Sequence, residues 1–256
     1  MKEVIYDYKK SAFQPNNFSN SIFMKTSKFK YPSVGILLLT LLLMIFSFNQ
    51  CSHGNHQGMA NKHMHKTSTK DLIEMFESPE RDAFQKPDQV IQFLGNIKGK
   101  KIIDIGAGSG YFSFRFAKKG AFVIAGDVNK EFLTHIEKRK LEEPYKPGTI
   151  ETRKLDYDSP NLKDNEVDIV FVCNVFHHIE NRIPYLEKIK KGLKSNGKLV
   201  IIDFPKYDKA IPFGGPPMEM RVSETEAKLE LEKIGFSVTK IDSKSLPYQY
   251  ILEATR

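Results

Sequence analysis

The sequence has almost no cysteine and, after residue 70, almost no net charge. Only Cys51 and Cys173 are cysteines. One follows an apolar run and the other lies in a predicted core strand, so we expect no stabilising disulfide. The chain carries a formal charge of +8, of which residues 1–70 hold +7 and residues 71–256 only +1. Because a nearly neutral body has no broad basic field, we expect no nucleic-acid partner.

The sequence also lacks an apolar run long enough to span a membrane comfortably. Residues 34–48 are fifteen residues, apolar apart from one glycine, one threonine and one serine. This is the usual length of the apolar region of a signal peptide. Three lysines lie closely before the run, and only Lys62 lies within fifteen residues after it. Positive charge stays on the cytoplasmic side, so we expect the rest of the chain outside the cytoplasmic membrane.

Cys51 follows the apolar run closely. This arrangement resembles the signal of bacterial lipoproteins, in which such a cysteine becomes the lipidated N-terminus. Residues 48–50 depart from the leucine and small residues usual there, and an uncleaved membrane anchor is the alternative. Both interpretations predict a membrane-associated protein on the extracytoplasmic side, attached through residues 34–51.

The N-terminal part divides into three segments. Residues 1–23 resemble neither a signal sequence nor a domain, so we expect Met24 to be the true start and residues 24–51 to be the signal or anchor. Residues 52–70 are polar and are predicted to form a flexible linker. Clustered imidazoles and thioethers make transition-metal binding an alternative for the linker, although we assign no metal site. The side chains concerned are His53, His56, Met59, His63, Met64 and His65.

The most informative segment is residues 101–112, an apolar run that ends in three alternate glycines, Gly106, Gly108 and Gly110. The pattern predicts a buried strand, a tight turn and the start of a helix, which is where α/β proteins bind nucleotide-like ligands. Glycine there lets the backbone pass close to a bulky ligand. A dinucleotide fingerprint needs G-x-G-x-x-G, and Tyr111 stands where its third glycine would be.

A second apolar run, residues 121–126, ends at Asp127. A carboxylate at the tip of the second strand can accept hydrogen bonds from both hydroxyls of a ribose. This supports a ligand that contains adenosine, without distinguishing a dinucleotide from S-adenosylmethionine.

The segment from Asp104 to Gly110, D-I-G-A-G-S-G, resembles the glycine motif of class I S-adenosylmethionine-dependent methyltransferases. Four further segments match that family in order, and the resemblance covers about residues 87–256. It implies an α/β fold with a Rossmann-like, seven-stranded mixed sheet flanked by helices. S-adenosylmethionine would lie along the carboxyl edge of the sheet. The further matching segments are residues 121–127, 153–158, 166–179 and 193–203.

The resemblance implies which residues bind the methyl donor. Asp156 and Tyr157 follow the third strand, where this family usually contacts adenine, and Asn174 ends the fourth strand beside the sulfonium. A solvated loop carboxylate is the alternative for Asp156, and a helix cap for Asp127. The full predicted set is Asp104, Gly106, Ala107, Gly108, Gly110, Asp127, Val128, Asp156, Tyr157 and Asn174.

Two histidines follow Asn174. Adjacent residues at the end of a strand face opposite ways, so only one of His177 and His178 can reach the substrate. We predict His178 as the general base and His177 as part of the acceptor pocket, with packing or capping as an equal alternative. Arg81, Gln85 and Phe176 are the other predicted pocket residues.

The sequence therefore predicts a methyltransferase domain over residues 71–256, with residues 71–96 as a lid over the donor. A lone Cys173 argues against arsenite and cytosine C5 methylation, and the segment from Asn174 to His177 lacks the turn of nucleobase amino-methyltransferases. We expect a small-molecule acceptor. The alternatives are a non-catalytic lipoprotein of this fold that binds a ligand or metal, and a nicotinamide oxidoreductase.

Overall fold

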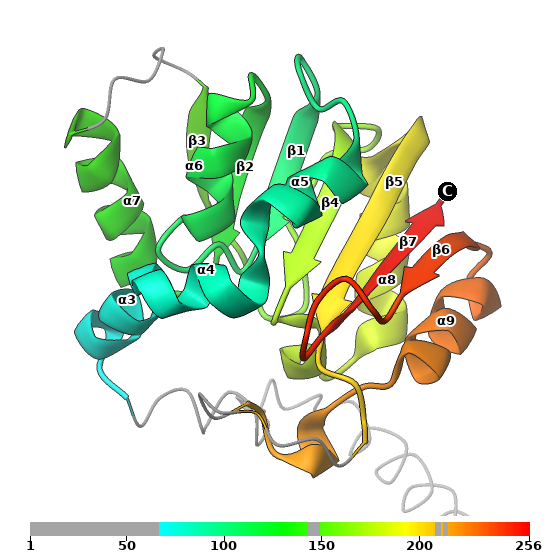
Figure 1. The fold of residues 1–256 in the computed structure, drawn as a ribbon. Helices are drawn as coiled ribbons and strands as arrows, with labels where there is room; N and C mark the ends of the chain where they lie inside the picture. Colours follow the sequence, from blue (N-terminus) through cyan, green and yellow to red (C-terminus); the bar gives the residue numbers. More distant parts are fainter. Residues whose placement is uncertain (1–66, 143–148, 208–210, 212–214) are drawn as a thin grey trace, which may run out of the picture. The chain divides into compact units, whose positions relative to one another are not determined.

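The computed structural model describes residues 67–142, 149–207, 211 and 215–256, all within one compact unit, His56–Arg256 (Figure 1). The predicted signal or anchor, Cys51 and the histidine-rich linker up to residue 66 lie outside the described residues. In the described part, no helix has the length and apolarity to cross a membrane. Those same residues bring together no group of three His, Cys, Asp or Glu side chains suited to a metal ion.

Seven strands form one sheet in the order β3-β2-β1-β4-β5-β7-β6. β7 runs antiparallel to both of its neighbours, and the other pairs are parallel. This confirms the predicted mixed sheet. The chain leaves β1 in one direction and returns beside it as β4, and ligands bind where the strand order reverses in this way. The strands are β1 (Lys101–Ile105), β2 (Phe122–Asp127), β3 (Ile150–Lys154), β4 (Val167–Cys173), β5 (Leu193–Asp203), β6 (Ser237–Asp242) and β7 (Tyr250–Thr255).

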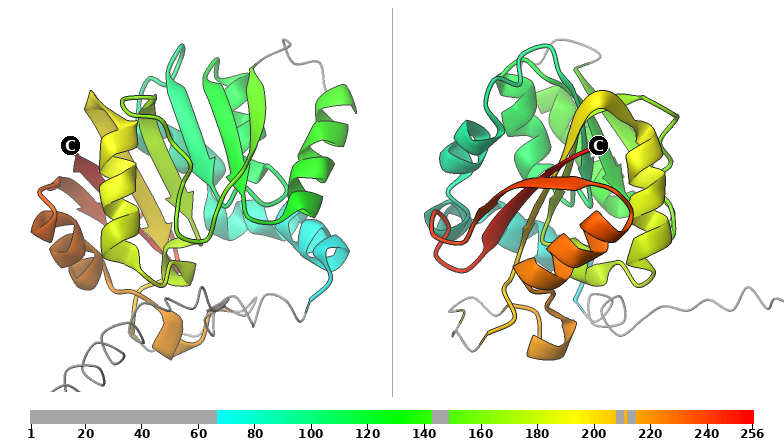
Figure 2. Two further views of the ribbon diagram at one scale, coloured as in Figure 1. Left: turned by 180° about the vertical axis from the view of Figure 1, so that it is seen from behind. Right: turned by 90° about the vertical axis from the view of Figure 1, so that its right-hand side faces the viewer.

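Helices cover both faces of the sheet, which explains why β1 and β4 are almost continuously apolar. On one face lie α5 (Pro87–Leu94), α6 (Tyr111–Lys118) and α7 (Lys130–Glu142), whose apolar side chains join one core cluster. On the other face lie α8 (Arg182–Gly192) and α9 (Glu224–Lys233), which join a second cluster. Figure 1 shows α5 in front of the sheet, and Figure 2 shows α8 from behind.

The segment predicted as a single lid is three short helices, α3 (Thr69–Glu77), α4 (Pro79–Gln85) and α5. Pro79 and Pro87 each occupy the first turn of a new helix, where a missing N–H costs nothing. The lid prediction is wrong for α5. Its side chains Val90 and Leu94 are buried in the core, so this helix packs against the sheet and does not cover the donor site. Only α3 and α4 remain candidates to cover the site.

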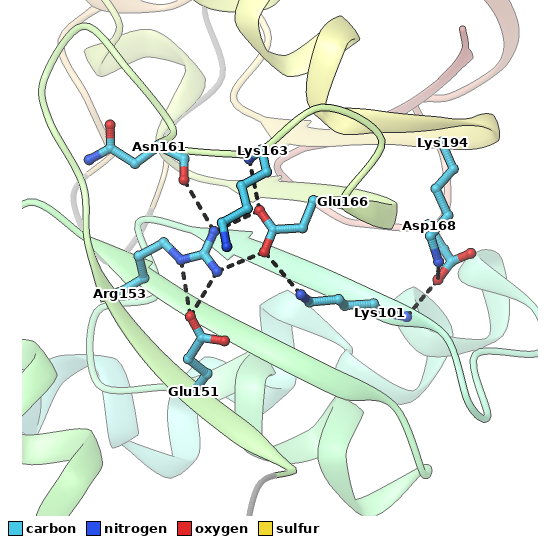
Figure 3. Close-up of polar contacts among 8 residues, drawn as sticks. All are labelled: Lys101, Glu151, Arg153, Asn161, Lys163, Glu166, Asp168 and Lys194. Carbon is cyan, nitrogen blue, oxygen red and sulfur yellow. Dashed lines mark hydrogen bonds and ion pairs between the residues drawn. The ribbon is translucent and has the colours of Figure 1, made fainter.

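The crossover from β3 to β4 contains no helix, and ion pairs and hydrogen bonds between side chains hold it in place (Figure 3). Arg153 donates to Glu166 at 2.8 and 2.9 Å and to the carbonyl of Asn161 at 3.1 Å. Lys101 lies 2.9 Å from the same carboxylate, whose side chain is only 7% exposed. Hydrogen bonds from Arg153 lower the pKa of Glu166 to about 2. The cluster fixes the crossover, which leads to the β4 strand of the site.

Candidate functional site

The glycine turn joins β1 to α6 and lies against the end of β2. The N–H groups of Gly106 and Ala107 both donate to the Gly126 carbonyl, at 2.8 and 3.0 Å. Gly106 has φ +71°, and a Cβ there would lie 2.3 Å from Val175 Cγ2. Glycine at 106 is therefore required by the contact with Val175, a constraint that the ligand argument alone did not identify.

Asp127 holds the turn in place. Its carboxylate accepts hydrogen bonds from the N–H of Gly108 at 2.9 Å and of Asn129 at 2.8 Å. Burial raises the pKa of Asp127, although these backbone hydrogen bonds oppose the shift. The next residue, Val128, is partly buried and accepts a hydrogen bond through its carbonyl from Lys154. The predicted ribose carboxylate is thus at the sheet edge, beside the glycines.

Asp104 is buried below the turn and accepts a 2.6 Å hydrogen bond from the hydroxyl of Ser113. Burial raises the pKa of Asp104 to about 6, against the effects of Ser113 and of the positive charge on Arg81. Ser113 was not predicted. The only sequence signal is a hydroxyl on the first turn of the helix that follows the glycines.

Arg81 reaches this edge from α4. Its guanidinium carbon lies 3.9 Å from the centroid of the Tyr111 ring, and Arg115 lies 3.8 Å from the same centroid. The Tyr111 hydroxyl donates to Asp82, which completes the contact between α4 and α6. Burial lowers the pKa of Arg81. The structure thus brings Arg81 to the donor side of the site, as a partly buried cation on an aromatic ring.

Phe76, on α3, covers the glycine turn. A Cβ at Gly108 would meet the Phe76 ring at 3.1 Å, and that ring lies 5.8 Å from the ring of Phe132. At the end of α3, Glu77 accepts hydrogen bonds from Arg139 at 2.9 Å and pairs with His135 at 2.9 Å. These contacts hold α3 over the predicted donor site.

Three amide side chains, two of them buried, meet at the same edge. Gln85 Nε2 donates to Gln249 Oε1 at 2.9 Å, and Gln249 Nε2 donates to Asn174 Oδ1. Asn174 Nδ2 completes the ring with a 3.4 Å contact to Gln85 Oε1, and its backbone has φ +59°. Gln85 and Gln249 are 0% and 3% exposed. Gln249 was missed because it lies 164 residues from its partner, and no local pattern links them.

The two histidines lie in a 3₁₀ turn, η1 (Phe176–His178), rather than at an extended strand end. The premise that they face opposite ways is wrong, because successive side chains in a 3₁₀ turn are about 120° apart and the two rings are 4.2 Å apart. His177 pairs with Asp203, at the end of β5, over 2.7 Å. This pairing favours His177 over His178 as the group that handles a proton.

Three other predicted residues lie elsewhere. Phe176 is fully buried in the second core cluster, so its assignment to the acceptor pocket is wrong. Asp156 and Tyr157 stand after β3 in a short turn, where Asp156 bridges Ser159. Both are exposed, Tyr157 at 47%, so the structure places no closed adenine pocket around them.

The geometry agrees with comparisons to known proteins. A family described as "methyltransferase domain" matches residues 103–201. An S-adenosylmethionine-dependent methyltransferase from Aquifex aeolicus is 27% identical, with a TM-score of 0.66, and the match covers 73% of this chain and 98% of that one. The fold also matches magnesium protoporphyrin IX methyltransferase from Synechocystis with bound S-adenosylmethionine, at 22% identity, TM-score 0.53 and coverage of 67% and 78%. The predicted fold, enzyme class and cofactor are confirmed by the matched family and the Aquifex enzyme, and the Synechocystis enzyme supports the fold alone.

The curated relatives correct one prediction. The chain is 32% identical over 167 residues to tRNA U34 carboxymethyltransferase of Proteus mirabilis, covering 61% of this chain and 50% of the relative. The same enzyme of Hydrogenovibrio crunogenus is 33% identical over 124 residues, covering 45% and 36%. The chain spans half or less of the length of these relatives. Because their name specifies tRNA, the expectation that excluded a nucleic-acid partner is wrong; net charge of the body was too coarse a criterion.

Proposed function

We propose that this chain, which carries a class I S-adenosylmethionine-dependent methyltransferase domain, transfers the methyl group of S-adenosylmethionine to tRNA. The observation that carries the proposal is the glycine turn bonded to Asp127 where the strand order reverses. There, the backbone of the glycines, which carry no side chains, lies next to the buried carboxylate of Asp127, an arrangement that fits an adenosine ligand. When bound, the donor supplies an electrophilic methyl group on a sulfonium.

The residues of the chain orient the reactants and exclude water. Gly108 presents bare backbone, and the Phe76 ring that now contacts it has to shift or stack for the donor to lie there. Arg81 brings a positive charge that suits the carboxylate of the donor's methionine end. Methyl transfer needs such alignment more than covalent catalysis.

The acceptor is proposed from the names of the curated relatives, which supports tRNA as the first substrate to test. If the attacking atom carries a proton, that proton must leave as the bond to carbon forms and the bond to sulfur breaks. We propose His177 as the group that receives it. Its Nδ1 faces Asp203, and a ring that donates through Nδ1 has an acceptor at Nε2.

We propose membrane association separately, supported by the apolar run of residues 34–48 and the lysines before it. A body outside the cytoplasmic membrane is incompatible with a cytosolic tRNA acceptor, so only one of the two proposals can hold for the same protein. Cell fractionation tests membrane association directly. We expect the native protein in the membrane fraction, with palmitate-analogue labelling lost in Cys51→Ser if that cysteine carries the lipid. Recovery in the soluble cytosol would contradict the proposal.

Donor binding and methyl transfer are measured separately. Calorimetric titration of the full chain in detergent should give micromolar affinity for S-adenosylmethionine. Methyl-labelled donor with bulk tRNA should then give labelled RNA, whereas labelled lipid or other small molecules would identify a different acceptor. A chain that does not bind the donor at all is not a methyltransferase of this kind.

A further inference from the structure

A groove of about 610 Å³ lies beside the site, between α5 and the segment formed by β6 and the turn after it. It is distinct from the glycine turn, and none of the predicted site residues lines it. Figure 1 shows α5 in front of the sheet and β6 at the end of the strand order, on the right. Its polar lining comes from three separate places in the chain.

Three lysines line this groove. Lys86 stands at the junction of α4 and α5, Lys240 lies on β6 and Lys244 lies in the turn after β6. Lys240 and Lys244 are exposed. Gln89 and Gln92, one helical turn apart on α5, add amide donors to the same lining. The groove therefore presents cationic and neutral hydrogen-bond donors together.

Two contacts hold the lysines in position. Lys86 Nζ donates to the Ser245 carbonyl at 3.1 Å, and Lys240 Nζ lies 4.1 Å from the centroid of the Phe93 ring. Asp242 also lines the groove, but its carboxylate accepts hydrogen bonds from the Ser245 hydroxyl at 2.6 Å and the Lys244 N–H at 2.9 Å. The carboxylate keeps its charge, but three lysines against one aspartate leave the lining of the groove positive.

The groove is coupled to the site through the chain. Lys86 is the residue after Gln85, and the turn that carries Lys244 continues to Gln249. Gln85 and Gln249 bond each other and Asn174 at the edge of the sheet. A polymer bound in the groove would therefore lie next to the end of β4, where methyl transfer is proposed.

We propose that this groove binds the phosphate backbone of an RNA acceptor and so aligns it with the methyl-transfer site. The proposal rests on the proposed tRNA acceptor. Lysines neutralise phosphates and release their counterions, which supplies most of the sequence-independent affinity for RNA. A polar, cationic groove without a deep apolar floor suits a phosphate chain better than an apolar small molecule.

The test compares two charge reversals of equal size in the full chain. Lys240→Glu with Lys244→Glu reverses the groove. Lys138→Glu with Lys233→Glu reverses two exposed lysines on α7 and α9 that do not line it. Both variants change the net charge equally, so the difference reports the groove. Anisotropy of a fluorescein-labelled tRNA transcript is measured over a series of salt concentrations, and thermal unfolding and donor calorimetry check each variant.

We expect the groove variant to bind tRNA roughly tenfold or more weakly and to lose about 1.5 from the slope of log affinity against log salt, since each phosphate contact contributes about 0.7 to 0.9. The control should stay near wild type, and both should retain donor binding. Equal weakening in the two variants, or no tRNA binding by wild type, would overturn the proposal. If inorganic pyrophosphate binds and tRNA does not, the groove serves a small phosphate ligand instead. Because the readout is RNA binding, its failure is separable from failure to bind the donor.

Discussion

Asp203 holds His177 at two points, accepting from the ring Nδ1 at 2.7 Å and from the backbone N–H at 3.0 Å. The same carboxylate also accepts from the N–H of Phe204 at 2.8 Å. Side chains of both partners are almost fully buried, at 4% and 0% exposure. This pair ties the end of β5 to the turn after β4 and fixes the orientation and tautomer of one imidazole.

The pairing predicts unequal roles for the two histidines. His177→Gln should slow methyl transfer by about 10²- to 10⁴-fold, the usual contribution of a general base, and leave donor affinity nearly unchanged. His178→Gln is the matched neighbour and should have a much smaller effect. Single-turnover transfer rates across pH, with unfolding curves for both variants, make the measurement. An equal loss in His178→Gln would return the role to His178.

Donor binding should depend on Asp127 rather than Asp156. Asp127→Ala removes an acceptor for two backbone N–H groups as well as the predicted ribose contacts. We expect S-adenosylmethionine binding to weaken by about 1.5 to 3 kcal/mol, as for lost charged hydrogen bonds. Asp156→Ala, at an exposed turn, should change it little. Calorimetry decides, and comparable losses would restore Asp156 as an adenine ligand. Gly106→Val is unsuitable here, because its side chain would strike Val175.

Acid stability should depend on Glu166. Its pKa falls from 4.5 to about 2 in the folded protein, so its contribution is present above about pH 4.5 and is lost as pH falls toward 2. Glu166→Gln should cost on the order of 2 to 3 kcal/mol at neutral pH, and the deficit should shrink through that window. Glu151→Gln is the control, since it pairs with the same Arg153 at 53% exposure. Urea titrations at several pH values measure both; a deficit that does not vary with pH would contradict the prediction.

The three amides of Gln85, Asn174 and Gln249 should behave as a coupled unit. Gln249→Leu leaves polar atoms of Gln85 and Asn174 without their partners, which should destabilise the fold by about 1 to 3 kcal/mol. Gln85→Leu should act similarly. In the double variant we expect less than the sum of the two, because neither glutamine then remains unsatisfied. Strict additivity in chemical denaturation would show that the pair is not coupled.

Local sequence was sufficient for the glycine turn and the buried strands beside it, whereas the seven-stranded mixed sheet was implied by the family resemblance. Apolar runs that end in glycine or aspartate predict buried parallel strands, since residue type and spacing alone determine that pattern. Asp104, Gly108 and Asp127 do gather at one edge, as expected. The packing of α5 against the sheet, where a lid was predicted, did not follow from local sequence, because burial depends on what surrounds the helix.

The errors arose where a role depends on distant partners. His177 and His178 look equivalent in sequence, and only the fold brings Asp203 to one of them. A phenylalanine such as Phe176 suits an apolar pocket and a hydrophobic core equally well, so its residue type could not tell the two apart. Net charge averaged over the body also hid the lysine groove, whose members are up to 158 residues apart in the chain.

The sequence by itself determined the glycine turn and a ligand that contains adenosine, because these follow from short-range spacing and backbone freedom. The resemblance to a methyltransferase family, not spacing, supplied the donor class and the seven-stranded sheet. Tertiary structure decided which histidine meets a carboxylate, which amides close a ring around Asn174 and where lysines converge. Each of these properties depends on side chains that are far apart in the sequence and meet only in the folded chain. Their geometry is set by the packing of whole strands and helices, which no local pattern encodes.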